Sequence, residues 1–373
     1  MTVPAVTVTR PVKRRPAFHK LSVAAVERLT DDAVAVRFDV PMELRETFAF
    51  RAGQHLTVRR LVPDEPEVRR SYSICSTPRA LAERGVLRIG VRAVAGGAFS
   101  AYAVGTLRPG DTVDVLPPLG HFTTAFAADR ARHYAAVAAG SGITPVLSLV
   151  ATALATEPAS RVTLVYANRY ARSVMFADEL ADLKDRYAAR LHLVHVLSRE
   201  PQSSALLSGR LDASRLAGIL TALVDPSTVD EWFLCGPYGL VLDAKEVLAE
   251  RVPGATVHTE LFHVDDGPPP PPRARPGGGS SATTSVTMVL DGRASSFEMK
   301  PDERVLDAAL RVRPELPYAC KGGVCSTCRA KVVEGRVEMV RNFALEPDET
   351  ANGYVLTCQS VPLSDKLVVD YDA

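Results

Sequence analysis

The sequence is poor in several features that would define its class at once. Only six of its 373 residues are cysteine, too few for a disulfide framework. No apolar run approaches the roughly 18 residues of a membrane span, so we expect no membrane association. The formal net charge is +1, and without a basic excess we expect no nucleic acid partner. Thiols of this number suit a reducing compartment, and the N-terminus lacks the apolar segment of a signal peptide, so we expect a cytoplasmic protein.

What is present predicts a multidomain globular chain. Apolar residues make up 46% and charged residues 23%, and the length favours two or three domains. Residues 264–285 contain five successive prolines and a glycine–serine stretch, which favour an extended linker that does not fold. We expect a flexible N-terminus at residues 1–16.

Three patterns define the expected domains. Residues 17–127 contain short strand-like runs separated by turn residues, which favour an antiparallel β-barrel. In residues 128–263 apolar strand-like runs alternate with helical stretches, the pattern of an α/β domain with a doubly wound parallel sheet. Residues 286–373 predict an α+β domain of the β-grasp type. It would have a hairpin at Asp291–Gly292, a short helix, one strand over residues 330–340 and two more strands.

Four cysteines in the last domain follow a spacing that binds iron and sulfide. Cys320, Cys325 and Cys328 form C-x4-C-x2-C and Cys358 follows, the spacing of a plant-type [2Fe-2S] cluster. Gly322 and Gly323 would let the backbone fold closely over an anionic cluster. A structural zinc site is the alternative, but zinc usually takes two short cysteine or histidine pairs and only one is present.

The sequence RSYS in the first domain fits a flavin. On a strand, Arg70 and Tyr72 share one face, where Arg70 can bind a pyrophosphate and Tyr72 can stack on the isoalloxazine. Ser71 and Ser73 would use their hydroxyl and N–H groups at the N5 edge. A glycine turn that opens a helix would add an anion site, and the candidate residues there, with the strand before them, are Val91, Ala93, Gly97, Ala98, Phe99 and Ser100. RSYS alone would favour an ordinary strand with a solvated arginine, and it is the glycine-rich helix entry further along the chain that favours a flavin.

The second domain carries a candidate nicotinamide site. The motif G-x-G-x-x-P follows a strand and opens a helix, with candidate residues Gly140, Gly142, Ile143, Thr144 and Pro145. A second motif, Cys235-Gly236-Pro237, ends a later strand at the same expected sheet edge. Cys235 would there contact the nicotinamide ring; the alternative is a buried structural thiol.

The ends of two further strands indicate which nucleotide binds. One strand ends in Asn168 and Arg169, and the next ends in Ser198 and Arg199. Arginines at this position favour the 2′-phosphate of NADPH, whereas an acidic residue would favour NADH. We therefore expect NADPH, with NADH as the less favoured donor.

Together and in this order, these motifs resemble the ferredoxin–NADP reductase family fused to a plant-type ferredoxin, which serves as the reductase component of bacterial oxygenases. The segments GGAFSAYA, DVLPPLGHF and YVLTCQSVPLSDKLVVDYDA are similar to the reductase subunits of phenylacetyl-CoA epoxidases within that family. The long proline–glycine linker departs from the family pattern.

The resemblance implies a set of cofactors, site residues and partners. It implies FAD at Arg70–Ser73 and Gly97–Ser100, and places Glu260 and Phe262 near the isoalloxazine, so Tyr72, Ser73, Cys235 and Phe262 are the candidate catalytic residues. Electrons would pass from NADPH through FAD and [2Fe-2S] to the di-iron oxygenase of a phenylacetyl-CoA epoxidase complex. The alternatives are an NADH-dependent reductase for a Rieske-type oxygenase such as 3-ketosteroid 9α-hydroxylase, a general diaphorase, and an iron–sulfur sensor.

Overall fold

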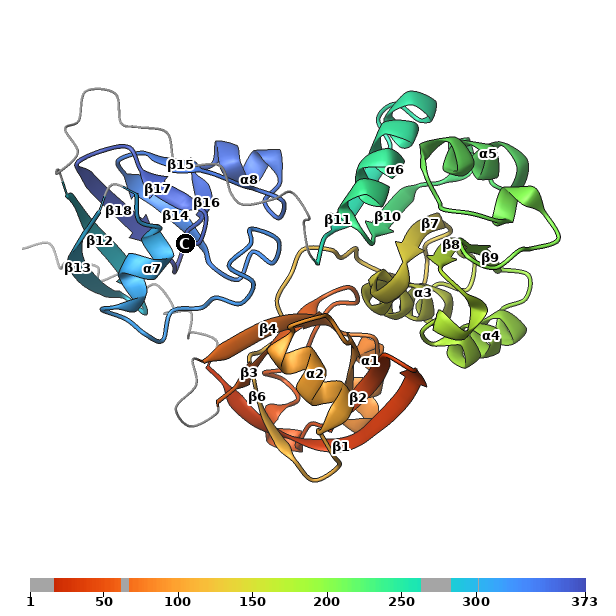
Figure 1. The fold of residues 1–373 in the computed structure, drawn as a ribbon, viewed down its shortest axis with the longest axis horizontal. Helices are drawn as coiled ribbons and strands as arrows, with labels where there is room; N and C mark the ends of the chain where they lie inside the picture. The colour runs from red at the N-terminus through yellow and green to blue at the C-terminus, as the bar shows by residue number, and fades with distance from the viewer. Residues whose placement is uncertain (1–16, 62–66, 263–282, 301) are drawn as a thin grey trace, which may run out of the picture. The chain divides into compact units, whose positions relative to one another are not determined.

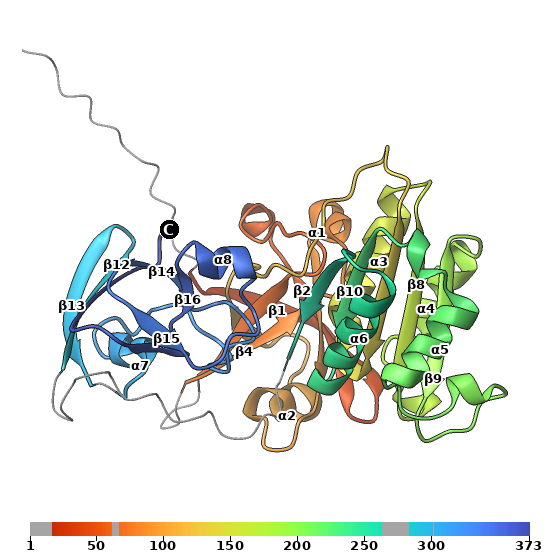
Figure 2. The same ribbon diagram turned by 90° about the horizontal axis from the view of Figure 1, so that it is seen from above.

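The computed structural model describes residues 17–61, 67–262, 283–300 and 302–373. The predicted flexible N-terminus and nearly all of the predicted linker lie outside these residues. The described residues form two compact units, one within residues 18–262 and the other within residues 283–373 (Figures 1 and 2). Each unit is described by itself below.

The first half of the first unit is the expected antiparallel barrel. Six strands lie in the order β4-β3-β6-β1-β2-β5, and a bridge between Ile74 and Ile89 brings β4 back to β5. The strands are β1 (His19–Thr30), β2 (Ala33–Asp39), β3 (His55–Arg60), β4 (Val68–Ser73), β5 (Val86–Arg92) and β6 (Thr112–Val115). Its helices are η1 (Met42–Leu44), α1 (Pro78–Arg84) and α2 (Ala98–Gly105).

Helix α1 was not expected among the strands, although its capping residues are visible in the sequence. The Thr77 side chain accepts a hydrogen bond from the Ala80 N–H, Pro78 occupies the first turn, and Gly85 ends the helix at φ 69°. With only seven residues, the helix is too short to show a clear period of its own.

The second half of the first unit is the expected parallel sheet. Five strands lie in the order β11-β10-β7-β8-β9, all parallel. They are β7 (His133–Ala139), β8 (Arg161–Asn168), β9 (Leu191–Leu197), β10 (Glu231–Cys235) and β11 (Thr256–Glu260). The main helices are α3 (Ile143–Thr156), α4 (Ala177–Arg186), α5 (Ala213–Leu223) and α6 (Tyr238–Arg251). Short 3-10 turns are η2 (Gly140–Gly142), η3 (Ala171–Ser173), η4 (Ala205–Leu207) and η5 (Pro226–Thr228).

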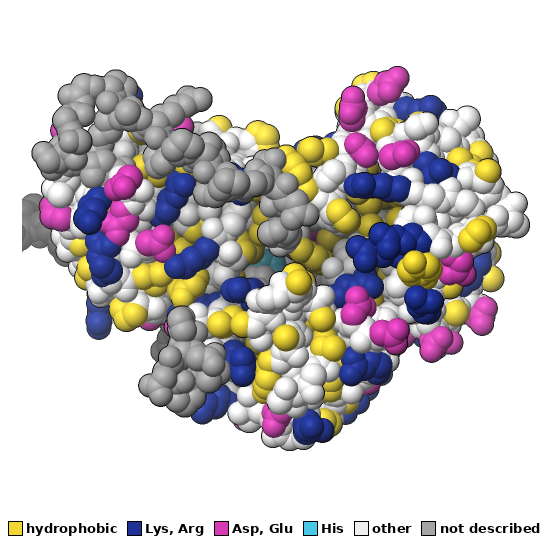
Figure 3. Space-filling model, in the orientation of Figure 1, with side chains coloured by type: hydrophobic (Ala, Val, Ile, Leu, Met, Phe, Trp, Pro, Cys, Tyr) yellow, Lys and Arg dark blue, Asp and Glu magenta, His cyan; other side chains and the backbone are white. Residues whose placement is uncertain are grey.

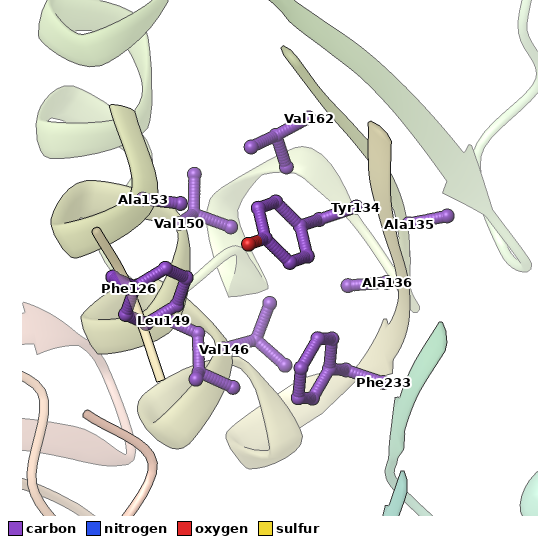
Figure 4. A pocket seen from close by; sticks show the side chains of 10 residues that line it. All are labelled: Phe126, Tyr134, Ala135, Ala136, Val146, Leu149, Val150, Ala153, Val162 and Phe233. Carbon is purple, nitrogen blue, oxygen red and sulfur yellow. The ribbon is translucent and has the colours of Figure 1, made fainter. Parts of the chain in front are cut away.

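The core of this domain is closely packed between β7, β10 and α3. A cavity of only about 10 Å³ lies there, and Figure 4 shows the Tyr134, Phe126 and Phe233 rings around it. That volume holds one water at most, so this cavity is a packing defect and not a ligand site.

The second unit is the predicted α+β domain. Its main sheet has the order β13-β12-β18-β14-β16, and β15 pairs with β17 beside it. The strands are β12 (Thr284–Leu290), β13 (Arg293–Met299), β14 (Arg329–Glu334), β15 (Val337–Met339), β16 (Tyr354–Leu356), β17 (Ser360–Pro362) and β18 (Lys366–Asp370), and the helices are α7 (Val305–Leu310) and α8 (Pro347–Ala351). The hairpin at Asp291–Gly292 is confirmed, with both residues at positive φ.

The single strand predicted over residues 330–340 is wrong. Gly335 adopts φ 90°, and the chain leaves the main sheet after Glu334 and pairs again as β15 with β17. An alanine there would place its Cβ 2.3 Å from the carbonyl oxygen of Lys366, so the turn requires glycine. In the described part of the chain, no helix has both the length and the apolar character needed to cross a membrane.

Candidate functional site

The four cysteines of the second unit lie around one loop. The loop joins α7 to β14, and it turns sharply because Lys321, Gly323 and Ser326 adopt positive φ. Cys328 ends the loop, and its carbonyl oxygen accepts hydrogen bonds from the N–H and the hydroxyl of Thr357. Because Thr357 precedes Cys358, these two bonds hold the distant fourth cysteine beside the loop.

The thiols associate as two pairs. Cys320 hydrogen-bonds with Cys325, which together with the backbone N–H groups of Val324, Gly322 and Cys325 lowers the pKa of Cys320. The Gly322 nitrogen lies 3.3 Å from the Cys320 Sγ. Cys328 hydrogen-bonds with Cys358, and this contact, followed by burial, raises the pKa of Cys328.

This arrangement fits a binuclear cluster. Two bridged irons take two thiolates each, which matches the division into two pairs. The N–H groups around Cys320 supply the donors that an anionic cluster needs. The assignment of these four cysteines as ligands stays a prediction.

The flavin motif occupies β4. Arg70 is exposed and Tyr72 is half-buried on the same face, with the Tyr72 ring 5.4 Å from that of Phe99. The Ser71 hydroxyl lies 3.4 Å from that of Thr57 on the neighbouring strand, and the Ser73 side chain is buried. Arg70 and Tyr72 can therefore meet a ligand from one side, as the motif predicts.

The glycine turn before α2 is held by its own serine. The Ser100 hydroxyl donates to the Gly97 carbonyl and accepts from the Val94 N–H. Val91 and Phe99 are at most 1% exposed, so their side chains support the site from beneath. The side chains of Ala93 and Ala98 are not buried.

The nicotinamide motif lies where the order of the parallel strands reverses, between β7 and β10. A Cβ on Gly142 would lie 2.1 Å from the carbonyl oxygen of Cys235, so only glycine lets the two loops approach this closely. Gly236 packs against Ala139, and Pro237 begins α6. The buried residues Ile143, Thr144 and Pro145 form the first turn of α3. Ligands of doubly wound sheets bind at such a reversal.

The flavin and nicotinamide motifs meet at Glu260. The Ser73 hydroxyl, in the barrel, donates a 2.8 Å hydrogen bond to Glu260 Oε2 across 187 residues of sequence. Glu260 pairs in register with Cys235 on the neighbouring strand. Phe262 follows two residues later and is 40% exposed. Candidate residues from three distant segments are thus adjacent.

The groups at this meeting point are neutral over much of the pH range. Burial raises the pKa of Glu260 to about 7, against the opposing effect of the Ser73 hydrogen bond. Burial, with the Glu260 charge second, raises the pKa of Cys235 well above its ordinary value. Cys235 is therefore a thiol and not a thiolate, which suits packing against a neutral ring.

His55 belongs to the same group of side chains around Glu260, although the sequence analysis assigned it no role. It pairs with Ser73 across β3 and β4, and its Nδ1 lies 3.9 Å from Glu260 Oε1. Burial lowers the pKa of His55 to about 4, so between pH 4 and 7 the contact joins two neutral groups and is not a salt bridge. The buried His55 Nε2 has no partner among the described residues, which leaves a polar atom for a bound ligand.

The residues predicted to select the nucleotide lie together at the ends of β8 and β9. Backbone hydrogen bonds join Ser198 to Asn168 and Arg199 to Arg169. Arg169 and Arg199 are both exposed, and Figure 3 shows Lys and Arg side chains gathered near β7 and β8. The buried side-chain amide of Asn168 has neither its nitrogen nor its oxygen hydrogen-bonded within the described part of the chain, so its hydrogen-bonding capacity is unused there.

Three family models match the chain. An oxidoreductase FAD-binding domain matches residues 20–124, an oxidoreductase NAD-binding domain matches residues 136–246, and a 2Fe-2S iron–sulfur cluster binding domain matches residues 288–363. The three expected cofactor classes are thereby confirmed. The boundaries predicted at residues 127 and 263 stay predictions.

Relatives share the whole arrangement. The chain is 46% identical to a 1,2-phenylacetyl-CoA epoxidase subunit of Escherichia coli (strain K12), over 95% of this chain and 98% of that one. It is 34% identical to the ferredoxin reductase component of a 3-ketosteroid-9-alpha-monooxygenase of Rhodococcus rhodochrous, over 94% and 96% of the two chains. Among solved structures, phthalate dioxygenase reductase shares the fold with a TM-score of 0.57 and 23% identity, covering 95% of this chain and 98% of the other.

Proposed function

Since the chain belongs to the family of NAD(P)H-dependent flavin and iron–sulfur reductases that includes this epoxidase component, we propose that it delivers electrons to the di-iron oxygenase of a phenylacetyl-CoA epoxidase complex. NADPH is the proposed donor. When bound, FAD takes up two electrons from the nicotinamide and releases them one at a time to a [2Fe-2S] centre.

The contact between Ser73 and Glu260 is the observation that carries the proposal. It joins the strand with the flavin motif to the strand beside Cys235, so a flavin on β4 and a nicotinamide at Gly142 and Cys235 would face each other. This proximity is the main contribution that a protein makes to transfer between two cofactors.

The chain's own residues have distinct proposed roles. Arg70 binds the pyrophosphate of FAD, and Tyr72 supports the ring from one side. Ser73 and Glu260 hold a proton between the Ser73 Oγ and the Glu260 carboxyl, because a carboxyl with a pKa of about 7 can gain or lose it near neutrality. Phe262, which is partly exposed, covers the ring face and keeps water out until the nucleotide enters.

Cysteines 320, 325, 328 and 358 are the proposed cluster ligands and the exit for electrons. The relatives include components of both epoxidase and ketosteroid monooxygenase systems. Membership of the family therefore leaves two kinds of oxygenase as candidate partners. Higher identity to the epoxidase component favours a di-iron partner.

A reconstitution experiment tests the partner. The purified holoprotein and NADPH would be combined with the oxygenase components of phenylacetyl-CoA epoxidase, and in parallel with a ketosteroid Rieske oxygenase. We expect coupled oxygen consumption and epoxide formation only in the first mixture. Turnover only with the Rieske oxygenase would reject the di-iron partner, and reduction of artificial acceptors alone would indicate a general diaphorase.

A further inference from the structure

We propose that Gln359 is a positioning residue that raises the reduction potential of the iron–sulfur centre by donating a hydrogen bond to the Cys358 sulfur and by fixing the cysteine loop. The inference rests on the cluster ligands proposed above. It concerns a residue for which the sequence suggested no role.

The side-chain amide of Gln359 contacts the cluster loop at two points. Its Nε2 donates to the Lys321 carbonyl oxygen at 2.8 Å and lies 3.6 Å from the Cys358 Sγ. The residue is 5% exposed, so water does not compete for these contacts. One amide group therefore touches both a ligand sulfur and the backbone next to another ligand, Cys320.

Both the backbone and the side chain of Gln359 are held in place. Its backbone carbonyl oxygen accepts hydrogen bonds from the Val340 N–H and from Arg304 Nη1 at 3.2 Å. On the other side, a Cβ at Gly323 would lie 3.1 Å from the Gln359 Cγ, so the loop packs directly on the side chain. Gln359 thus joins the segment before α7, the segment after β15 and the cysteine loop.

Such a donor has a defined electrostatic effect. One-electron reduction adds a negative charge to the cluster, and an N–H aimed at a ligand sulfur stabilises that added charge. The effect is stronger in a buried site than in water because the local dielectric is low. Removing the donor while preserving the shape of the side chain should therefore make the centre harder to reduce.

Two substitutions in the full-length holoprotein separate the donor from the packing. Gln359→Met keeps an unbranched side chain of similar length without an N–H, and Gln359→Glu keeps the shape but replaces the donor with an acceptor. EPR-monitored redox titration measures the midpoint potential of the iron–sulfur centre. In the Met variant the reduction equilibrium should shift about tenfold toward the oxidised state, which is a potential lower by about 59 mV for one electron. The Glu variant should shift further in the same direction.

Ser360→Ala is the matched control. Ser360 is the next residue and is fully buried, but its hydroxyl donates to the Leu356 carbonyl and contacts no thiol of the described residues. The reduction potential of the iron–sulfur centre in the Ser360→Ala variant should equal that of the wild type. Unchanged potentials in both Gln359 variants, with full iron content, would overturn the inference, as would an equal shift in Ser360→Ala.

A measurement on the wild type covers the case in which the variants lose their cluster. The sequence contains only three glutamines, Gln54, Gln202 and Gln359, and only the last lies in the second unit. With ¹⁵N in the glutamine side-chain amides, pulsed EPR of the reduced protein should detect one coupled nitrogen; its absence would overturn the inference. A wild-type protein without any cluster signal would reject the ligand assignment itself.

Discussion

Two cysteines, Cys235 in the first unit and Cys320 in the second, show how differently the two redox regions are built. Cys235 is 1% exposed and lies beside Glu260, and both effects raise the pKa of its thiol. Cys320 is partly exposed and receives hydrogen bonds from a neighbouring thiol and three backbone N–H groups, which lower its pKa. The Cys235 thiol is thus kept neutral, whereas Cys320, unlike Cys328 in the same region, is favoured as the thiolate.

The difference matches the charges that each region handles. A nicotinamide–flavin pair exchanges two electrons together with a proton, and a site of buried neutral groups suits that chemistry. An iron–sulfur centre takes single electrons and carries negative charge, so it needs thiolates and N–H donors. The first site also joins residues far apart in sequence, whereas three of the four cysteines proposed as cluster ligands lie within nine residues.

The substitution Cys358→Ser tests most strongly whether the flavin site and the four-cysteine site work independently. We expect the cluster to be lost, because the fourth ligand is missing, and delivery of electrons to the oxygenase to be lost with it. NADPH-dependent reduction of ferricyanide by the flavin should stay within about twofold of the wild type, since that site lies in the other unit. Iron and sulfide analysis and the two assays check this.

Cys75→Ala is the control for that change, because Cys75 is a buried thiol of the barrel that we do not assign as a ligand. It should leave the iron content unchanged. If Cys358→Ser also abolished ferricyanide reduction, the two sites would not be independent.

Gly142→Ala tests the close approach of the two nucleotide loops. Its Cβ would collide with the Cys235 carbonyl oxygen, and backbone atoms cannot move aside without disturbing β10. We expect the first unit to lose about 1–3 kcal/mol of stability, with weaker NADPH binding measured by calorimetry. In Gly105→Ala the new methyl group meets nothing within 4 Å, so that variant should bind normally.

The pH dependence of stability tests the neutral state of Glu260. Its folded pKa of about 7 lies above the ordinary 4.5, so its contribution to stability is full below pH 4.5 and is lost as pH rises through 7. Above pH 8 the wild type should be about 3 kcal/mol less stable than at pH 4.5 from this group alone. Glu260→Gln should remove that loss.

Fluorescence-detected denaturation measures this effect in the first unit, because the only tryptophan, Trp232, is buried in β10. Glu83→Gln, at an exposed position of helix α1, provides the control and should keep the wild-type pH dependence. An identical pH dependence in Glu260→Gln would show that Glu260 is ionised in the folded protein at neutral pH.

The smallest expected effect concerns the choice of nucleotide. Arg199→Ala should lower kcat/KM for NADPH about tenfold, equivalent to about 1.4 kcal/mol, and change that for NADH less than about twofold. Arg186→Ala removes the same charge from the end of α4 and should change neither value. A wild-type enzyme that prefers NADH would reject the assignment of Arg169 and Arg199.

The sequence predicted the domain types because its periodic patterns are local. Alternating strands and helices, the hairpin at Asp291–Gly292 and the four-cysteine spacing all lie within short windows. It did not predict α1 or the break at Gly335, since a seven-residue helix and a single glycine give little periodic signal.

Contacts between distant segments were beyond the sequence patterns. Glu260 entered only through the family resemblance, and nothing in the sequence placed it on Ser73. His55 and Gln359 were missed because the value of a buried polar side chain depends on what folds against it. The role of His55 follows from its Nε2, which has no partner among the described residues. The role of Gln359 follows from its contact with the Cys358 sulfur.

Anaerobic titration of the full-length holoprotein with NADPH, followed by visible and EPR spectroscopy, tests the central claim most directly. We expect bleaching of the flavin absorbance together with a signal from a reduced cluster, in protein that contains iron and sulfide in equal amounts. Bound zinc in place of iron, or a fully reduced flavin with a cluster that stays oxidised, would contradict the proposal that electrons enter in pairs at the flavin and leave singly through the four cysteines.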